Sequence, residues 1–397
     1  MERAPALAFP PAPLDDPPAA PNRDGLRVSG LRVTLGGVEV VHGTELAVMP
    51  GEVLGLVGES GSGKSVSLRA IPGLLPAGAA VSGEVLWNGV DLLTLPPREL
   101  QRTRGREVAM IFQEPGLALN PVMTVGAQIE ESLLVHHPSL GRRARRERAE
   151  ALLAEVGIPS PRTRLSSYPH EFSGGMRQRA MIAIALAPGP RLLLADEPTT
   201  ALDVTVQDGI LRLLLRLVSD HRMAMVLVTH DLGVVAETCS RVAVMYAGRV
   251  VESGPARRIF RHPRHAYTAA LLGAMPGEGG AGGRLFPVPG MPPSPRAMPP
   301  GCAFAPRCNW VMPGCLPAVP PLVPAECWVD GRVEMPAPVP LPADEQRSAC
   351  LAADRLPPRT GATAAAAQPA AGTPPPGGAP PPQAGPALAT GTPRSHP

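Results

Sequence analysis

The feature that most constrains this chain is an eight-residue loop at 58–65, which fits the pattern G-x-x-x-x-G-K-S. A short apolar run, Val53–Val57, precedes the loop, and a helical pattern at 67–71 follows it. In a strand–loop–helix context, glycines let backbone N–H groups turn inward around phosphates at the start of the helix. The sequence therefore predicts a phosphate-binding loop in an α/β fold, made of Gly58, Glu59, Ser60, Gly61, Ser62, Gly63, Lys64 and Ser65.

Lys64 is the only lysine among the 37 basic residues of the chain. Its compact ammonium group can reach the β- and γ-phosphates of a nucleotide, whereas a planar guanidinium would be too bulky. The hydroxyl of Ser65 can in turn bind Mg²⁺. A chance glycine-rich turn is the competing interpretation of the loop, and the strand and helix patterns on either side argue against it.

A second signal is the apolar run Leu192–Ala195, followed directly by Asp196 and Glu197. A buried strand that ends in a carboxylate places this group at the edge of an open α/β sheet where ligands bind. Asp196 can hold Mg²⁺ through its water shell, and Glu197 can act as general base on an attacking water. An acidic turn is common on its own, but the phosphate loop at 58–65 favours the catalytic interpretation.

Composition divides the 397 residues into four parts. Glycine (42) and proline (53) make up about a quarter of the chain, too many for one compact fold throughout. Short apolar runs alternate with helical patterns, as in α/β domains, and predict buried strands at Val53–Val57, Leu192–Ala195, Met225–Thr229 and Val242–Tyr246. We expect a disordered Pro-rich N-terminus at 1–24, a nucleotide-binding domain at 25–255, a small cysteine-containing domain at 256–352 and a disordered Ala/Pro-rich tail at 353–397.

Charge and cysteine usage indicate the compartment and the kinds of partner. The net charge of +3 gives no indication of nucleic-acid binding. The N-terminus lacks the apolar core of a signal peptide, and no run of about 18 uncharged apolar residues predicts a membrane-spanning helix. We therefore expect a reducing, cytoplasmic environment. There, five cysteines within 302–350 favour metal or cluster binding over disulfides, while Cys239 lies in an apolar run and suits core packing.

Four further motifs follow one another in a definite order. The run Phe172–Arg179, Phe-Ser-Gly-Gly-Met-Arg-Gln-Arg, resembles the signature sequence of ATP-binding cassette (ABC) proteins. Gln113 matches the Q-loop of that family, Asp203 its D-loop and His230 its switch histidine. A lone histidine after a strand is more often structural, but its place in this series favours the switch role. The resemblance covers the chain from about residue 26 to residue 352.

The resemblance implies an α/β fold of the P-loop NTPase class, with a helical subdomain at about 115–185 and a small C-terminal extension. It also implies ATP and Mg²⁺ as cofactors. By this resemblance the metal ligands are Ser65, Gln113 and Asp196, and the catalytic residues are Glu197, His230 and Gln113.

Members of this family act in pairs, so the resemblance also implies partners. Two subunits face head to tail with two ATP molecules between them, and each ATP lies between the phosphate loop of one subunit and the signature of the other. Ser173, Gly174, Gly175 and Asp203 would therefore serve the nucleotide of a second ABC ATPase subunit, identical or different. Two integral-membrane permease subunits and, indirectly, an extracytoplasmic solute-binding protein would complete the assembly at the cytoplasmic face of the membrane.

Finer matches lie within one branch of the family. Leu119–Pro121, Met245–Arg249, His262–Thr268, Pro289–Pro293 and Gly301–Cys308 resemble the dipeptide/oligopeptide/nickel permease ATPases. The resemblance implies import of di- or oligopeptides, with nickel or another small solute as the alternative. A soluble ABC protein of DNA repair or translation is less favoured, because the chain has one cassette and no long heptad run. A degenerate regulatory subunit is not indicated, because the motif residues are intact.

The late cysteines are part of the same resemblance. In this branch, four cysteines at the positions of Cys302, Cys308, Cys315 and Cys350 are linked to a [4Fe–4S] cluster. Four thiolates also suit Zn²⁺, and Cys327 is an alternative fourth ligand. We expect a structural or redox-sensing cluster rather than a catalytic one; ordinary thiols in a Pro-rich segment are the other interpretation.

One position departs from the family pattern. Many members stack an aromatic ring on the adenine near the first strand, and the matching residue here is Leu35. We therefore expect adenine stacking to be weaker or to be supplied elsewhere. Selectivity between nucleobases does not follow from the sequence.

Overall fold

The computed structural model describes residues 25–200, 202–274, 288–329, 332–333 and 345–358. The chain begins with a four-stranded antiparallel sheet in the order β2-β1-β4-β5. Its strands are β1 Leu26–Leu35, β2 Val38–Val48, β4 Ala80–Trp87 and β5 Val90–Asp91. Buried and exposed residues alternate along β1, as expected for a sheet with one face on the core and one face in water.

An eight-stranded sheet, in the order β11-β14-β10-β9-β3-β8-β7-β6, forms the centre of the molecule. Five of its strands are parallel, and all the residues of the three in the middle are buried, because layers cover both faces of this part of the sheet. The four predicted strands are confirmed to within one residue. The parallel strands are β3 Val53–Val57, β6 Val108–Ile111, β7 Leu192–Asp196, β8 Ala224–Val228 and β9 Arg241–Tyr246.

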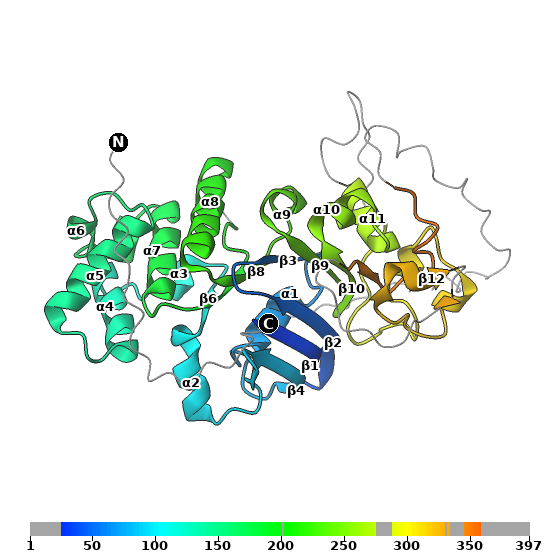
Figure 1. Ribbon diagram of the computed structural model, residues 1–397, viewed down its shortest axis with the longest axis horizontal. Helices are drawn as coiled ribbons and strands as arrows, with labels where there is room; N and C mark the ends of the chain where they lie inside the picture. Colours follow the sequence, from blue (N-terminus) through cyan, green and yellow to red (C-terminus); the bar gives the residue numbers. More distant parts are fainter. Residues whose placement is uncertain (1–24, 201, 275–287, 330–331, 334–344, 359–397) are drawn as a thin grey trace, which may run out of the picture.

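Helices cover the sheet and extend it at one end, where α4 to α7 form a separate group beyond α8 (Figure 1). This group lies within the range expected for the helical subdomain. The helices are α1 Lys64–Ala70, α2 Pro97–Arg106, α3 Pro115–Ala118, α4 Val125–His136, α5 Arg142–Glu155, α6 Pro161–Arg164, α7 Gly174–Leu186, α8 Val204–His221, α9 Leu232–Thr238, α10 Ala256–Arg261 and α11 Ala266–Gly273, with a 3₁₀ turn η1 at Pro169–Glu171.

Two hydrophobic clusters lie on opposite faces of the central sheet. Val57 and Ala195 belong to the cluster under the helices, whereas Leu56 and Leu194 belong to the cluster under the antiparallel sheet. Alternate residues of each strand thus point to different layers. The strands themselves are fixed between the two layers, and so are the loops that leave their carboxyl ends.

The C-terminal region joins this sheet directly. Strand β14, Arg347–Ser348, pairs with β10, Arg249–Pro255, and carries β11, Val323–Pro324, on its other side. The short pair β12 Trp328–Val329 and β13 Arg332–Val333 and the 3₁₀ turns η2 Ala305–Arg307, η3 Pro313–Cys315 and η4 Ala325–Cys327 complete it. Sequence composition places a boundary at residue 255/256, but the sheet continues across it.

Glu252 secures this junction. Its carboxylate is fully buried and accepts hydrogen bonds from the backbone N–H groups of Arg264 (2.7 Å) and His265 (3.0 Å) and from Nε2 of Gln346 (2.7 Å). Burial raises the pKa of Glu252 to about 7, although these donors partly offset that effect. With these donors, the buried carboxylate ties β10 to the start of α11 and to Gln346, the residue directly before β14.

The predicted disorder of 1–24 and of most of the tail falls outside the described residues. Residues 353–358 are described, and Ala353 (0% exposed) and Leu356 (5%) are buried in the core. Within the described part of the chain, no helix has both the length and the apolar character needed to cross a bilayer.

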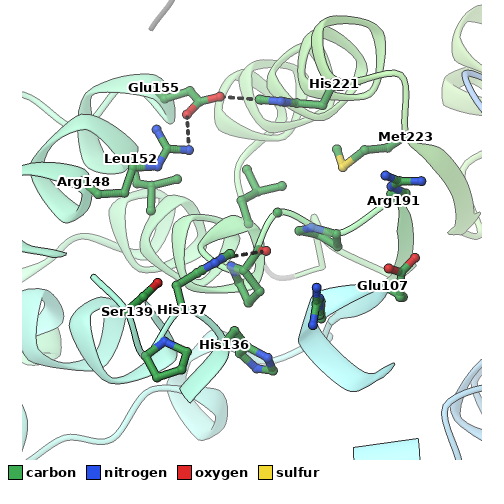
Figure 2. Close-up of a pocket in the computed structure, with 16 residues that line it drawn as sticks. Glu107, His136, His137, Ser139, Arg148, Leu152, Glu155, Arg191, His221 and Met223 are labelled. Atoms are coloured by element: carbon green, nitrogen blue, oxygen red, sulfur yellow. Dashed lines mark hydrogen bonds and ion pairs between the residues drawn. The ribbon is translucent and has the colours of Figure 1, made fainter. Parts of the chain in front are cut away.

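An ion pair links the helical group to the centre of the fold. Nε2 of His221, the last residue of α8, lies 2.6 Å from Oε1 of Glu155, the last residue of α5, and Nη2 of Arg216 donates to the Glu155 carbonyl at 2.9 Å (Figure 2 shows Glu155 and His221). The hydrogen bond to Glu155 raises the pKa of His221. Burial alone would raise the pKa of Glu155, but its hydrogen bond to His221 and the nearby positive charges lower it.

This pair predicts a pH-dependent stability. Because the folded pKa of His221 is raised, its contribution is complete below its unfolded pKa of about 6.5 and is lost as the pH rises through the folded value. The lowered pKa of Glu155 keeps the acid ionised down to about pH 4.5. His221→Gln should therefore reduce the free energy of unfolding by about 1 kcal/mol near pH 5.5, and by less above pH 8, in urea titrations.

Arg212→Gln on the same helix is the matched control, since Arg212 and its partner Asp208 form an exposed ion pair without a histidine. It should leave the free energy of unfolding unchanged at both pH values, because exposed ion pairs contribute little. An effect of His221→Gln of equal size at pH 5.5 and pH 8.5 would contradict the assignment.

Candidate functional site

The loop at 58–65 leaves the carboxyl end of β3 and leads into α1, as the sequence predicts. Two of its glycines are required by the geometry. A Cβ on Gly58 (φ 150°) would lie 2.1 Å from the Met245 carbonyl oxygen, and Gly63 has φ 100° beside the Val40 carbonyl. Only glycine therefore allows the loop to pack this closely against the neighbouring strands and to keep its N–H groups on the inner side.

Lys64 is buried (5% exposed) and folds back over the loop. Its Nζ donates to the carbonyl oxygens of Gly58 and Glu59, both at 2.8 Å, and lies 3.4 Å from Oγ of Ser62. Burial lowers the pKa of Lys64, while the carboxylates of Glu197 and Asp196 act in the opposite direction. The ammonium group is thus held at the centre of the loop by acceptors that a phosphate oxygen could replace.

Asp196 lies opposite the loop, at the end of β7, with a side chain that is fully buried. Its Oδ1 accepts from Oγ of Ser65 at 2.7 Å, and its Oδ2 accepts from Nη2 of Arg69 at 3.2 Å. The structure therefore brings together two of the three predicted magnesium ligands. A hydroxyl and a carboxylate are oxygen donors of the kind that Mg²⁺ takes alongside water and phosphate oxygens, so the residues fit the ion.

The carboxylate of Glu197 lies close to the other two predicted catalytic residues, Gln113 and His230. Its Oε2 accepts from Nε2 of Gln113 at 3.1 Å and from Oγ1 of Thr200 at 2.8 Å, and lies 3.5 Å from Nδ1 of His230. Its backbone has φ 45°, a left-handed conformation that is unusual for a residue other than glycine. Strain of this kind is typical of functional sites. Thr200 was not expected from the sequence, since no motif marks it.

Lys64, Ser65, Gln113, Glu197 and His230 line one cavity of about 730 Å³, whereas Asp196 and Thr200 are not among its lining residues. That volume is in the range of small-molecule sites. At one end lie Lys64, Gln113, Glu197 and His230, which carry the polar and charged groups of the phosphate site. The remaining wall comes from β2, from the end of β9 and the turn after it, and from a segment of the C-terminal region. Its residues are Val40, His42, Tyr246, Ala247, Gly248, Pro292, Pro293, Ser294, Pro295 and Met298.

The signature residues lie elsewhere, and none of them lines this cavity. Ser173 caps α7 and accepts from the Met176 N–H at 3.3 Å, and Gly174 and Gly175 form the first turn of that helix. Asp203 caps α8 in the same way, accepting from the Val206 N–H at 3.0 Å. A Cβ on Gly175 would lie 2.7 Å from Cγ1 of Val206, so the two helix starts pack side by side.

The cysteines of the C-terminal region occupy a second, small enclosed site. Cys302, Cys308, Cys315 and Cys350 line it together with Trp310 and other residues, whereas Cys327 is not among its lining residues. Burial, with a further contribution from the neighbouring thiols, raises the pKa of Cys308 to about 11 and that of Cys350 to about 12.

No three His, Cys, Asp or Glu side chains converge on a point suited to a single metal ion within the described residues. Cys239 is buried in the main core, as expected.

A third cavity, of about 410 Å³, lies away from the phosphate loop, where the helical group meets the sheet (Figure 2). His136, His137 and Ser139 at the end of α4 form one side. Nε2 of His137 lies 3.0 Å from the Pro188 carbonyl on the segment before β7. The other side carries Arg148, Leu152 and Glu155 of α5, with Arg191, His221 and Met223.

A phosphate loop, a buried aspartate at the end of another strand of the same sheet and a glutamate beside it define the class: a P-loop ATPase. Two family models match the chain, ABC transporter at residues 41–200 and oligopeptide/dipeptide transporter, C-terminal region, at residues 251–315. The first contains the phosphate loop, the signature and the Asp–Glu pair. The second contains three of the four cavity-lining cysteines.

Relatives and solved structures agree with these matches. The chain is 51% identical over 298 residues to a protein of Brucella melitensis described as a peptide import ATP-binding protein, covering 72% of this chain and 88% of that protein. It is 46% identical over 312 residues to the oligopeptide transport ATP-binding protein OppD of Salmonella typhimurium, covering 78% and 92%. A dimeric ATP-binding cassette in a post-hydrolysis state with ADP and Pi superimposes with a TM-score of 0.52 at 28% identity, covering 58% of this chain and 99% of that chain.

The chain therefore belongs to the ABC transporter ATP-binding proteins, in the group that carries the oligopeptide/dipeptide transporter C-terminal region, and it is an ABC-type ATPase.

The position of Glu197 leads to a specific prediction. Glu197→Gln keeps the hydrogen bonds of the side chain but removes the base that would accept a proton from water. Hydrolysis should slow by a factor of about 100 or more, while ATP binding and closure of the dimer persist. ATPase rates and ATP-dependent dimerisation of the chain assembled with its partner measure this.

Glu237→Gln, on the exposed face of α9, is the control and should hydrolyse ATP at the normal rate. Normal hydrolysis by Glu197→Gln would show that the assignment of the general base is wrong.

Proposed function

We propose that this chain is the ATP-hydrolysing, energy-coupling subunit of an ABC importer for di- or oligopeptides. The observation that carries the proposal is the single cavity in which Lys64, Glu197, Gln113 and His230 meet, with Ser65 on Asp196 beside them. Two relatives named for peptide import and oligopeptide transport support the solute class. We place the chain at the cytoplasmic face of the membrane, as a peripheral subunit.

In this proposal each residue has a defined task. Lys64 and the loop N–H groups bind the β- and γ-phosphates, and Ser65 and Asp196, with Gln113, hold Mg²⁺, which neutralises charge on the phosphate oxygens. Glu197 accepts the proton of the attacking water. His230 lies close to Glu197 and contacts the γ-phosphate, which keeps the reacting groups in line.

The second half of each nucleotide site comes from a partner ATPase. Ser173 is exposed and forms the cap of α7, so it is free to meet a phosphate presented by another subunit. Asp203 at the start of the adjacent helix α8 belongs to the same surface. We infer that one chain supplies half of two sites, and that a second ABC ATPase, a copy or a related chain, supplies the rest.

The cavity in Figure 2 is our candidate for the permease contact. It spans the joint between the helical group and the sheet, so a segment seated there would respond when the two parts move. Its lining includes the basic Arg106, Arg148 and Arg191 with the apolar Leu152 and Met223. An amphipathic cytoplasmic segment of an integral-membrane subunit fits this chemistry. The extracytoplasmic binding protein would contact only the permeases.

We also propose a [4Fe–4S] cluster in the cysteine-lined site. Zn²⁺ held by the same four thiolates is the alternative. Each iron of a cluster takes its own thiolate, and Cys302, Cys308, Cys315 and Cys350 line one small site together, which supports them as the four ligands. The place of Cys327 outside this lining supports Cys350 as the fourth ligand.

The solute assignment predicts a transport phenotype. Cells that carry Lys64→Ala should lose uptake of a labelled dipeptide, because the nucleotide site no longer binds the phosphates. Ser139→Trp, which fills the cavity of Figure 2 from an exposed position, should also abolish uptake but leave ATP binding unchanged. Loss of nickel uptake alone would assign the chain to a metal importer. Unchanged uptake of both solutes would refute the solute assignment and leave the ATPase intact.

The cluster predicts a second measurement. The full chain purified without oxygen should contain about four irons and four sulfides and show a visible charge-transfer band. Cys350→Ala should lose most of the iron, whereas Cys327→Ala should retain it. A chain that contains neither iron nor sulfide, or one whose iron depends on Cys327, would contradict the proposed ligand set.

A further inference from the structure

The C-terminal region reaches into the nucleotide cavity. Pro292, Pro293, Ser294, Pro295 and Met298 line it, although more than 220 residues separate them from the phosphate loop in sequence. These lining side chains are uncharged, and they face a cavity whose other end holds Lys64, Glu197 and His230. Arg296, within the same segment, is exposed and is not among the lining residues. The cavity thus has a charged end that suits phosphates and an apolar wall that suits an uncharged part of a ligand.

Arg307 fixes the position of this segment. Its Nη1 and Nη2 donate to the two carboxylate oxygens of Glu59, at 2.8 and 3.0 Å, inside the phosphate loop. Its Nε donates to the Pro289 carbonyl at 2.6 Å, and Nη2 also reaches the Val288 carbonyl at 3.4 Å. The side chain of Arg307 is only 6% exposed. A single guanidinium therefore joins the start of the segment to the phosphate loop, with the geometry of a bidentate pair.

Aromatic rings pack around Arg307 and stabilise the contact between the C-terminal region and the phosphate loop. Tyr246, Tyr267 and Phe304 pack together, with ring centroids 4.5 to 5.4 Å apart, and Arg307 lies over the rings of Tyr246 and Phe304. The Tyr267 hydroxyl accepts from the backbone N–H of Glu59 at 2.8 Å. Loop and C-terminal region are thus held by side-chain and backbone contacts together, which makes the wall a fixed part of the site.

The first strand offers no comparable surface. Leu35, at the position where related cassettes carry an aromatic ring, packs against the core and is not among the residues that line the cavity. Val40 and His42 of β2 do line it, beside Ala247 and Gly248. Val40 and Ala247 offer a nucleoside on this side only a small apolar surface, which the proline segment enlarges.

We propose that the segment Pro292–Met298 is the nucleoside-binding wall of the site, which takes the purine base in place of an aromatic side chain from the first strand. Rigid, apolar proline rings and a polarisable methionine sulfur suit the face of a heterocycle. An uncharged wall would add nothing to the binding of phosphates, which need cations or N–H donors. The inference rests on the nucleotide site proposed above.

The test compares two ligands that share the phosphates and differ in the base. The full chain with Glu197→Gln, which prevents turnover, is titrated with Mg-ATP and with Mg-tripolyphosphate. Pro293→Ser combined with Met298→Ser should weaken ATP binding about tenfold, since apolar contact with the base is lost. Tripolyphosphate binding should remain unchanged. Met291→Ser is the control: this residue is 86% exposed, lies outside the lining and should affect neither ligand.

Arg307→Lys tests the positioning of the wall. The substitution keeps the positive charge but removes the fork that holds Glu59 and Pro289 together. It should lower ATP affinity about fivefold while the affinity for tripolyphosphate stays within about twofold. A merely structural role would weaken both ligands equally or lower the unfolding temperature alone.

Three outcomes would overturn the inference. Unchanged ATP affinity in the double variant, with a normal unfolding temperature, would show that the base lies elsewhere. An equal loss for both ligands would show that the segment acts only through the phosphate loop. ATP binding that Lys64→Ala leaves intact would refute the nucleotide site itself, and with it the wall.

Discussion

The parallel alignment of β3, β7 and β8 is the constraint on which the site depends. Val228 of β8 pairs with Leu56 of β3 on one side and with Asp196 of β7 on the other. The three strands therefore end at the same edge of the sheet. The loop after β3 holds Lys64, the end of β7 holds Asp196 and Glu197, and His230 follows β8. Lys64 and His230 are more than 160 positions apart in the sequence, so no local sequence preference could bring these groups together. The sheet does so because both of its faces are buried and its register is fixed.

The C-terminal region is an extension of this arrangement rather than an independent unit. It adds β14 and β11 to the edge of the same sheet and is anchored there by the buried carboxylate of Glu252. From that edge it returns to the phosphate loop through Arg307. A region placed in this way can support the nucleotide site without holding any of the reacting groups, and the cysteine-lined site lies within it, next to Arg307 in sequence.

Much of the site could be predicted from the sequence, because its chemistry is local. The phosphate loop, the Asp196–Glu197 pair and the four buried strands each depend on a few consecutive residues, and the structure has them where the patterns place them. The order of motifs identified the family for the same reason. Contacts between segments that are distant in the sequence leave no local pattern from which they could be predicted. The pair of Glu59 and Arg307 joins residues 248 positions apart, and no spacing rule connects them.

The C-terminal region shows the same limit in two further ways. Its proline content predicts an irregular segment, but composition does not say which surface such a segment covers. The cysteine spacing left Cys327 and Cys350 open as the fourth ligand. In the fold Cys350, two residues after β14, lines the same small site as the other three cysteines, whereas Cys327 ends η4 outside that lining. Residue 352 was likewise expected to end the ordered chain, yet Leu356 packs in the core.

The most direct test of the account is an experimental structure of the Glu197→Gln chain, assembled with its partner, in the presence of Mg-ATP. The account predicts the triphosphate in the loop at 58–65, with Nζ of Lys64 moved from the carbonyls of Gly58 and Glu59 onto phosphate oxygens, and Mg²⁺ beside Ser65 and Asp196. The base should lie against Pro292–Met298, and Ser173 of the opposing subunit should meet the γ-phosphate. A nucleotide bound outside this cavity, or a Lys64 that keeps its contacts within the loop while ATP is bound, would contradict it.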